Sequence, residues 1–161
     1  MVRLATASDA RFKVDPSEVA STAPSYTVHT LERLRATQGA ATPLMLLMGA
    51  DALRGLAGWY RWRELFDLAH IAVATRPGFP FASLEDEVAE EFARRRTSGV
   101  DYWHFPAGGI VPFELVAGTV SATEVRGLLA TDAPREQLLE RLPAPVIDYV
   151  AQHSLYRSYS T

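Results

Sequence analysis

Cysteine is absent from this sequence, which excludes disulfide bonds and thiolate metal sites. A cysteine-free chain is compatible with a reducing cytoplasm, and we expect a cytoplasmic protein. A surplus of basic residues is also missing, because 16 lysines and arginines stand against 19 acids and the net charge is -3. The chain therefore has no basic footprint for DNA or RNA, and a nucleotide partner is expected to be a small molecule.

Long apolar runs are missing as well. No run approaches the roughly 20 residues that a membrane helix needs, and residues 1–10 are too polar for a signal peptide, so no membrane partner is expected. The familiar phosphate-binding motifs GxxxxGK[ST], GxGxxG and HxGH do not occur. The four histidines have no metal-ligand spacing, and each is interpreted as an ordinary structural residue: His29, His70, His104 and His153.

What is present is the composition of an ordinary globular domain, with 161 residues, 48% of them hydrophobic and 22% charged. Pro43–Met48 and Ile71–Thr75 are short uncharged runs, typical of strands that are buried in a parallel sheet. Helical patterns are predicted for residues 25–39, 61–68, 83–96, 121 onward and 142–153. Strands alternating with helices predict an α/β fold of the doubly wound kind, with a Rossmann-like parallel sheet and helices on both faces.

Weaker patterns give further expectations. Residues 1–10 have apolar residues at helical spacing, and short strands are predicted at Phe12–Asp15, Tyr102–Phe105 and Glu114–Ala117. Ser25 is predicted to cap the first long helix, and Gly39 to end it. Two capping boxes are predicted, formed by Ser83 with Asp86 and by Ser121 with Glu124.

The first buried strand ends at Gly49, and Asp51 and the pair Trp59-Tyr60 follow it. Ligands of open α/β sheets bind at the carboxyl ends of the strands, so these residues stand where a binding site is expected. Thr27, at the start of a helix, could hold an anionic group together with free backbone N–H groups. The alternative left open is that Asp51 and Thr27 only cap helices and that the aromatic pair belongs to the core.

A second set of candidates follows later strands. Arg76 comes directly after Ile71–Thr75, and Ser121 begins a helix that carries Arg126 on its second turn. A helix N-terminus with a hydroxyl cap and a nearby guanidinium favours phosphate, although Arg126 could equally be a surface residue. We expect Asp51, Arg76 and the Ser121 helix start to converge on one crevice.

Together these motifs resemble those of bacterial nicotinate mononucleotide adenylyltransferase, over nearly the whole chain. The motifs are SYT at 25–27, MGAD at 48–51, WY at 59–60, ATRPG at 74–78, SATEVR at 121–126 and PAPVIDYVAQHSLYR at 143–157. The resemblance implies a cytoplasmic enzyme of NAD biosynthesis that joins the adenylyl group of ATP to nicotinate mononucleotide, releases pyrophosphate and uses Mg²⁺. It leaves a homo-oligomer open.

The resemblance also implies roles in the mononucleotide site. Thr27 and the backbone of Tyr60 would receive the nicotinate carboxylate, and Trp59 would stack on the pyridine ring. Asp51 would accept hydrogen bonds from ribose hydroxyls, and Arg76 would line the mononucleotide site or the phosphate crevice.

In the ATP site that the resemblance implies, Gly49 would let backbone approach the nucleotide, and Asp51 would contribute again. Ser121 and Arg126 would hold the phosphates as the catalytic residues, with Thr123 supporting their loop. No protein nucleophile is required, because the phosphate of the mononucleotide attacks ATP and catalysis consists of positioning and charge stabilisation.

One departure from the family is the missing HxGH-type motif. From it we expect residues 1–161 to form a single nucleotidyltransferase domain that lacks its first strand-helix unit, roughly 30 residues by the proportions of a βαβ unit. His29, where an acid is common, is a smaller departure. Two alternatives stay open: a sister adenylyltransferase for another acceptor such as pantetheine phosphate, and an inactive nucleotide-binding module.

Overall fold

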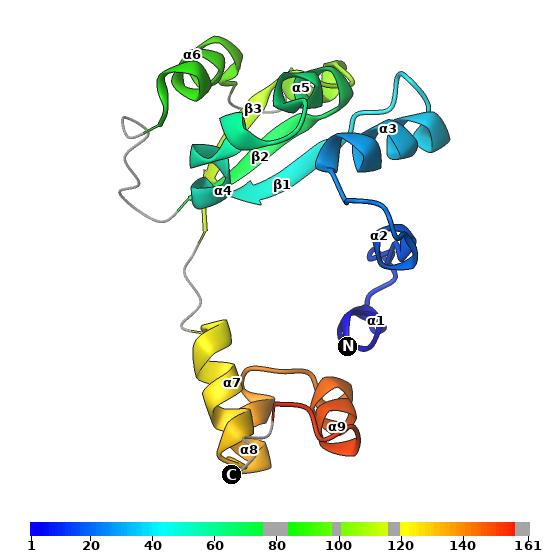
Figure 1. The fold of residues 1–161 in the computed structure, drawn as a ribbon, viewed down its shortest axis with the longest axis vertical. Coiled ribbons are helices and arrows are strands. Elements are labelled where there is room, and N and C mark those ends of the chain that lie inside the picture. Colours follow the sequence, from blue (N-terminus) through cyan, green and yellow to red (C-terminus); the bar gives the residue numbers. More distant parts are fainter. Residues whose placement is uncertain (76–83, 98–100, 116–119, 157–161) are drawn as a thin grey trace. The chain divides into compact units, whose positions relative to one another are not determined.

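The computed structural model describes residues 1–75, 84–97, 101–115 and 120–156 (Figure 1). The chain divides into two compact units. The sheet unit comprises residues 17–117, and the helical unit comprises residues 1–16 and 118–161. No helix among the described residues combines the length and the apolar character needed to cross a membrane.

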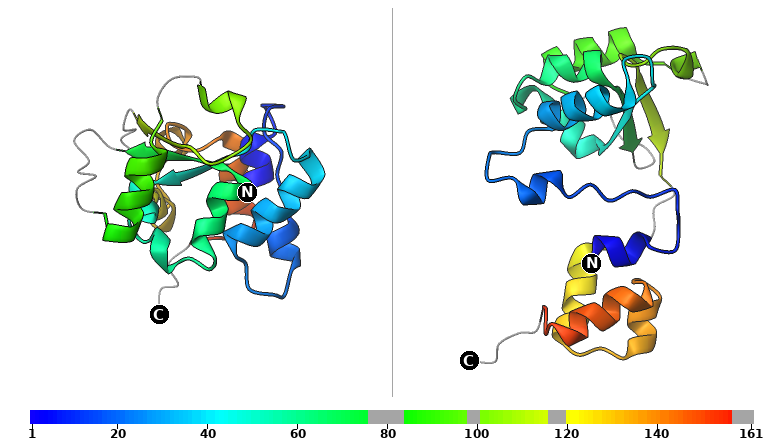
Figure 2. Two further views of the ribbon diagram at one scale, coloured as in Figure 1. Left: turned by 90° about the horizontal axis from the view of Figure 1, so that it is seen from above. Right: turned by 90° about the vertical axis from the view of Figure 1, so that its right-hand side faces the viewer.

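The sheet unit holds all three described strands. In chain order its elements are α2 (Ser17–Ala20), α3 (Thr27–Gln38), β1 (Met45–Gly49), α4 (Ala50–Arg54), η1 (Leu56–Gly58), η2 (Trp62–Glu64), α5 (Leu65–Leu68), β2 (His70–Thr75), α6 (Asp86–Arg95), η4 (Asp101–His104) and β3 (Ile110–Glu114). Strands and helices alternate, as the sequence predicts. Figure 2 shows the same unit from two further directions.

The three strands form one parallel sheet in the order β1-β2-β3. Met48 lies opposite Val73 in the first pair, and Ile71 lies opposite Ile110 in the second. The two strands predicted from uncharged runs are therefore real, parallel and adjacent, with bounds that differ from the predicted ones by up to two residues. The predicted burial is confirmed for β2 but is wrong for β1, where only Met48 is buried and Leu47 is 65% exposed. The α/β class with a Rossmann-like sheet is confirmed.

One face of the sheet carries the core of this unit. Residues two apart in a strand share a face, so Ile71 and Val73 point the same way, and both are fully buried. Their neighbours in the core come from the other strands and from the surrounding helices: Val28, Leu31, Met48, Leu53, Leu56, Trp62, Leu65, Phe66, Val88, Phe92 and Ile110. Helices α3 to α6 all contribute side chains to this core and thereby hold the strands in place.

Three predicted strands are wrong wholly or in part. Tyr102–Phe105 lies mostly in the 3-10 helix η4, where the Phe105 N–H donates to the Tyr102 carbonyl at 3.2 Å. The strand predicted at 114–117 is β3, which begins at Ile110 and ends at Glu114; residues 116 and 117 lie outside the described residues.

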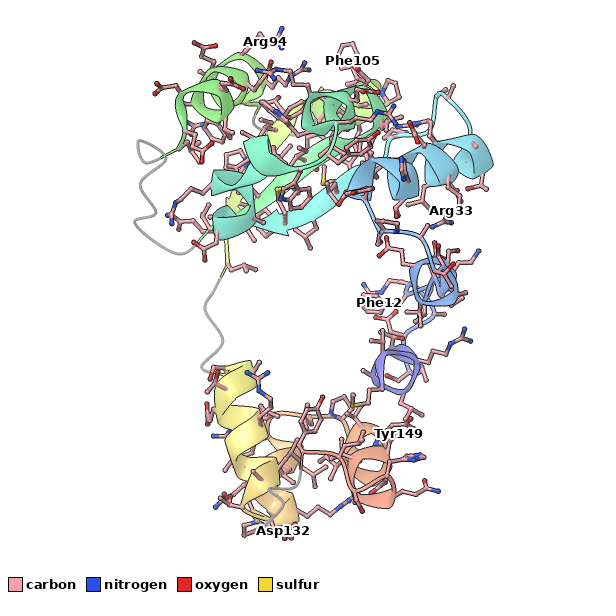
Figure 3. The ribbon with its side chains drawn as sticks, viewed as in Figure 1. Phe12, Arg33, Arg94, Phe105, Asp132 and Tyr149 are labelled. Carbon is pink, nitrogen blue, oxygen red and sulfur yellow. The ribbon has the colours of Figure 1, made fainter. Side chains whose placement is uncertain are left out.

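Phe12–Asp15 forms no strand either. Arg11 bonds to the Asp9 carboxylate, and the Phe12 N–H donates to the Asp9 carbonyl at 3.1 Å, so the segment begins in a turn. Phe12, labelled in Figure 3, is 62% exposed, so the apolar side of this alternating segment does not pack on a sheet.

The predicted helix ends have mixed outcomes. Tyr26, not Ser25, is the N-cap of α3, and its side chain makes no capping hydrogen bond. Gly39 ends α3 as predicted, with a φ of 93° that favours glycine. Helix α6 begins at Asp86 with Glu85 at the N-cap, and the predicted cap Ser83 lies outside the described residues.

The helical unit consists of α1 (Val2–Thr6), α7 (Ala122–Ala130), α8 (Arg135–Leu139) and α9 (Ala144–Gln152). The helices predicted near residues 1–10, 121 and 142–153 are thereby confirmed. Helix α9 buries Val146, Ile147 and Val150, and α8 buries Leu138. Helix α1 contacts α9.

Candidate functional site

Gly49 and Asp51 lie at the carboxyl end of β1, as predicted. Gly49 is the last residue of the strand and the N-cap of α4, so Asp51 falls in the first helical turn. A β-carbon at Gly49 would meet no atom within 4 Å, so the backbone here borders open space. The Asp51 side chain is 93% exposed and lies 3.6 Å from the guanidinium of Arg54. Its carboxylate oxygens are thus accessible to hydrogen-bond donors of a ligand.

The structure brings Thr27, Trp59 and Tyr60 together around one cavity of about 270 Å³. We call it the aromatic pocket; it is lined by Ser25, Tyr26, Thr27, Gly58, Trp59 and Tyr60. One wall is the start of α3 and the other is the turn between η1 and η2. Trp59 is half-buried and packs against the core, whereas Tyr60 is 51% exposed. Trp59 thus fits both interpretations of the aromatic pair, because it packs against the core and also lines the pocket. Tyr60 lines the pocket and does not belong to the core.

Aromatic rings line this pocket on both walls. The rings of Tyr26 and Tyr60 are 4.6 Å apart between centroids with a tilt of 36°, and His29 meets Tyr60 nearly edge-on at 5.8 Å. Within the described residues, the backbone N–H groups of Thr27 and Tyr60 donate to no protein acceptor. Two free donors beside stacked rings are suited to a flat ligand that carries an anionic group.

Ser121 caps α7 in the helical unit, as predicted. Its hydroxyl accepts a hydrogen bond from the Glu124 N–H at 3.1 Å. The returning half of the predicted capping box is not formed among the described residues, and the Glu124 carboxylate accepts a bond from the Nε of Arg141 at 2.9 Å. Arg141 lies in the turn that follows α8, so this ion pair links α7 to that turn.

Arg126 lies on the exposed surface of α7, where its Nη2 donates to the hydroxyl of Thr123 at 3.3 Å. Arg126 also borders a cavity of about 320 Å³ whose other walls are mainly apolar. The helix start with Ser121, Thr123 and Arg126 therefore has the parts of the predicted phosphate cradle within one unit. Its convergence with Asp51 stays a prediction, and Arg76 lies outside the described residues.

A larger cavity of about 450 Å³ lies at the opposite, amino end of β2, where His70 begins the strand. Arg94 and Phe105, both labelled in Figure 3, are among its lining residues. Both nitrogens of the His70 ring are already hydrogen-bonded within the protein. This cavity contains none of the predicted site residues.

Sequence reasoning missed Arg61, which directly follows the aromatic pair. Its guanidinium reaches Glu32 in α3 and Glu64 in η2. The spacing Arg61 to Glu64 is a visible helical pair, but the bond to Glu32 crosses 29 residues and leaves no local pattern.

Metal ligands are not clustered in the described part of the chain, which contains no group of three or more His, Cys, Asp or Glu side chains that could hold an ion. Mg²⁺ often keeps several waters and binds through substrate phosphates and one or two carboxylates. Exposed Asp51 fits such a minimal donor set, whereas a cage made only of protein ligands has no counterpart among these residues.

The sequence is similar to known proteins over nearly its full length. The family model described as cytidylyltransferase-like matches residues 1–128. A probable nicotinate-nucleotide adenylyltransferase of Dechloromonas aromatica is 54% identical over 161 residues, which cover 98% of this chain and 73% of that protein. A protein of the same name from Chromobacterium violaceum is 44% identical, over 98% of this chain and 72% of that protein.

Solved structures agree on the fold. Nicotinic acid mononucleotide adenylyltransferase of Plasmodium falciparum, complexed with APC, matches with a TM-score of 0.54 and 14% identity, over 84% of this chain and 60% of that one. The same enzyme complexed with NaAD matches equally well over 58% of its chain. The chain thus spans 73% and 72% of these two curated relatives and less than two thirds of the solved chains. By the match to the family model and the identity to its relatives, the chain belongs to the cytidylyltransferase-like family, and within it to the nicotinate-nucleotide adenylyltransferases.

Proposed function

We propose that this protein transfers the adenylyl group of ATP to nicotinate mononucleotide, giving nicotinate adenine dinucleotide and pyrophosphate in NAD biosynthesis. The observation that carries the proposal is the aromatic pocket, in which Thr27 meets the pair Trp59-Tyr60 from a distant part of the sequence. The names of the relatives point to the same reaction. Residues 1–161 would act as one nucleotidyltransferase domain, and the cysteine-free sequence is compatible with the cytoplasm.

The aromatic pocket suits the nicotinate ring of the mononucleotide. Its volume of about 270 Å³ accommodates a single flat ring with its carboxylate. The unpaired N–H groups of Thr27 and Tyr60 would donate to the carboxylate, and the Trp59 ring would stack on the pyridine. An uncharged amide accepts such bonds less strongly than a carboxylate does, so the acid would be the preferred substrate.

The end of β1 would hold the ribose. Asp51 is exposed enough to accept hydrogen bonds from two hydroxyls, which is a common task of an acid near a strand end in nucleotide-binding folds. The open space beside Gly49 would admit the nucleotide close to the backbone. Arg76, which the family resemblance assigns to the mononucleotide site or the phosphate crevice, lies outside the described residues.

The start of α7 would hold the phosphates of ATP. The free N–H groups and the dipole of the helix favour an anion, and the Arg126 guanidinium can form two parallel bonds to phosphate oxygens. Ser121 and Thr123 would order this loop, since each already makes a hydrogen bond there. These residues would stabilise charge on the phosphate that is attacked by the mononucleotide, and no protein nucleophile is required.

Mg²⁺ would enter with ATP as part of the substrate. The described residues offer no cluster of three ligands, so phosphate oxygens and water would supply most of its coordination. The ion would neutralise charge on the leaving pyrophosphate.

The test is the release of pyrophosphate from ATP in the presence of nicotinate mononucleotide, compared with pantetheine phosphate as the acceptor. We expect release with the first acceptor only. Trp59→Ala should weaken binding of nicotinate mononucleotide by about 1 to 3 kcal/mol in calorimetry and leave ATP binding nearly unchanged. Trp103→Ala, which removes an exposed tryptophan from the same unit, is the matched control. Equal losses for both ligands in Trp59→Ala would contradict the proposed pocket.

A further inference from the structure

The two walls of the aromatic pocket meet through rings rather than through backbone pairing. Tyr60 on one wall contacts Tyr26 and His29 on the other. Ring contacts of this kind do not fix one geometry, because aromatic pairs adopt both offset-stacked and edge-to-face arrangements over centroid distances of about 4.5 to 7 Å. The distance between Trp59 and the Thr27 N–H therefore depends on whatever else fixes the turn that carries the aromatic pair.

Arg61 supplies a directional link between the walls. Its Nη2 donates to Oε1 of Glu32, on α3, at 2.8 Å. Its Nε donates to Oε1 of Glu64, in η2, at 2.8 Å, and Nη2 also bonds to the second oxygen of Glu64. The guanidinium thus forms two bonds to Glu64 on its own wall and a further bond to Glu32 on the opposite wall. Its carbon also lies 6.0 Å from the centre of the Tyr60 ring.

The ion pairs of Arg61 orient its side chain but contribute little to the stability of the fold. The hydrogen bonds to Glu64 and then to Glu32 raise the pKa of Arg61, and the bond from Arg61 lowers the pKa of Glu64. All three side chains are a third to a half exposed, however, and ion pairs at such exposure contribute little to folding stability. What a bidentate arginine does provide is a fixed direction.

The backbone conformation of Arg61 supports a role for its side chain. Its φ of 53° and ψ of 40° are left-handed, a conformation that a β-carbon disfavours and that glycine adopts freely. The chain thus carries an arginine where a glycine would fit the turn with less strain. The left-handed backbone does not require an arginine here, so the contribution of this residue lies in the bonds that its side chain forms.

From these observations we infer that Arg61 is a positioning residue for the mononucleotide, which sets Trp59 and Tyr60 against the start of α3 through its bonds to Glu32 and Glu64. The inference rests on the proposed function and deepens it. The link fixes the spacing between the ring that stacks on the pyridine and the N–H groups that receive the carboxylate. Arg61 itself touches neither group of the ligand.

The test compares Arg61→Gly with Arg63→Gln by calorimetry with nicotinate mononucleotide and, separately, with ATP. Arg63 is a matched control because it lies two residues further along, in η2, and forms its own ion pair, with Glu87, at 2.8 Å. Arg61→Gly should bind the mononucleotide about tenfold more weakly, since small misplacements of positioning groups are costly. Its affinity for ATP and its midpoint of thermal unfolding should stay unchanged, because glycine suits the left-handed turn. Arg63→Gln should bind both ligands like the wild type.

A double-mutant cycle with Arg61→Gln and Glu32→Gln identifies the link itself. If the two residues act through one bond, the double variant binds the mononucleotide no more weakly than the weaker single variant. Fully additive losses, unchanged affinity in Arg61→Gly, or equal loss of ATP and mononucleotide binding would each overturn the inference while leaving the proposed function intact. A wild-type chain that does not bind the mononucleotide would overturn the proposed function, and the inference with it.

Discussion

The imidazole of His70 joins the start of β2 to the segment that leads into β3, because its Nδ1 accepts a hydrogen bond from the Gly109 N–H at 2.9 Å. Since Nδ1 accepts, the proton of the neutral ring lies on Nε2, which donates to the Phe105 carbonyl at 2.8 Å. The residue is only 2% exposed, and the Tyr102 ring meets it nearly edge-on at 5.9 Å. His70 is therefore a structural histidine, as the sequence interpretation held.

Replacing this histidine should destabilise the sheet unit. His70→Ala leaves the Gly109 N–H and the Phe105 carbonyl unpaired and opens a cavity, so we expect a loss of about 2 to 4 kcal/mol in urea unfolding. His104→Ala, at an exposed position, should change stability by less than about 0.5 kcal/mol. Equal unfolding midpoints for the two variants would show that the buried hydrogen bonds of His70 contribute nothing.

The same histidine explains why one strand prediction is wrong. Tyr102–Phe105 is predicted as a short strand, but Tyr102 packs its ring on His70 and the Phe105 carbonyl accepts the bond from the Nε2 of His70. Those contacts join residues that are distant in sequence, so the local sequence alone could not anticipate them. The run at 71–75 was predictable because β2 is buried along almost its whole length, as a central parallel strand is expected to be. The run at 43–48 gave the right kind of element, but β1 is not buried on both faces, because Leu47 is 65% exposed.

The candidate site was predictable to a similar extent. Thr27 and the pair Trp59-Tyr60 stand at a helix start and after a strand end, where physical rules and family resemblance both place ligand contacts. Arg61 was not predictable, since its importance comes from a bond to Glu32 on another helix. Long-range side-chain geometry of this kind is set by packing and has no local signature.

The cap at Ser121 gives a second stability prediction. Ser121→Ala removes the acceptor for the Glu124 N–H and should destabilise α7 by about 1 kcal/mol. Ser25→Ala should have little effect on α3, because Tyr26 occupies the N-cap of that helix. Faster hydrogen exchange at the Glu124 amide in Ser121→Ala checks the first expectation, and thermal unfolding of Ser25→Ala checks the second. A larger loss in Ser25→Ala than in Ser121→Ala would contradict both assignments.

Acid should weaken the end of α6 through Glu91. A hydrogen bond from Arg94 lowers the pKa of Glu91 below its ordinary 4.5; partial burial opposes this, and a bond from Arg95 supports it. A carboxylate whose pKa is depressed by folding stabilises the protein above the unfolded value, and that contribution is lost as pH falls through the folded pKa.

We therefore expect Glu91→Gln to remove part of the stability at neutral pH and to flatten its fall between about pH 5 and about pH 3. Unfolding by urea at a series of pH values measures this slope. Glu90→Gln, at an exposed position on the same helix, is the control and should keep the slope of the wild type. A wild-type slope in Glu91→Gln would mean that its pairing with the two arginines is absent in solution.

Arg126→Lys should not behave as a conservative change. The side chain is exposed and bonds only to Thr123 among the described residues, so stability should change by less than about 0.5 kcal/mol. Turnover with ATP and nicotinate mononucleotide should fall by about tenfold or more, because a lysine ammonium cannot copy the two parallel bonds that a guanidinium forms with phosphate. Arg135→Lys, on α8 of the same unit and paired with Asp148, is the control and should keep the turnover of the wild type. Pyrophosphate release measures both variants, and an Arg126→Lys enzyme with unaltered turnover would exclude this guanidinium from the phosphate site.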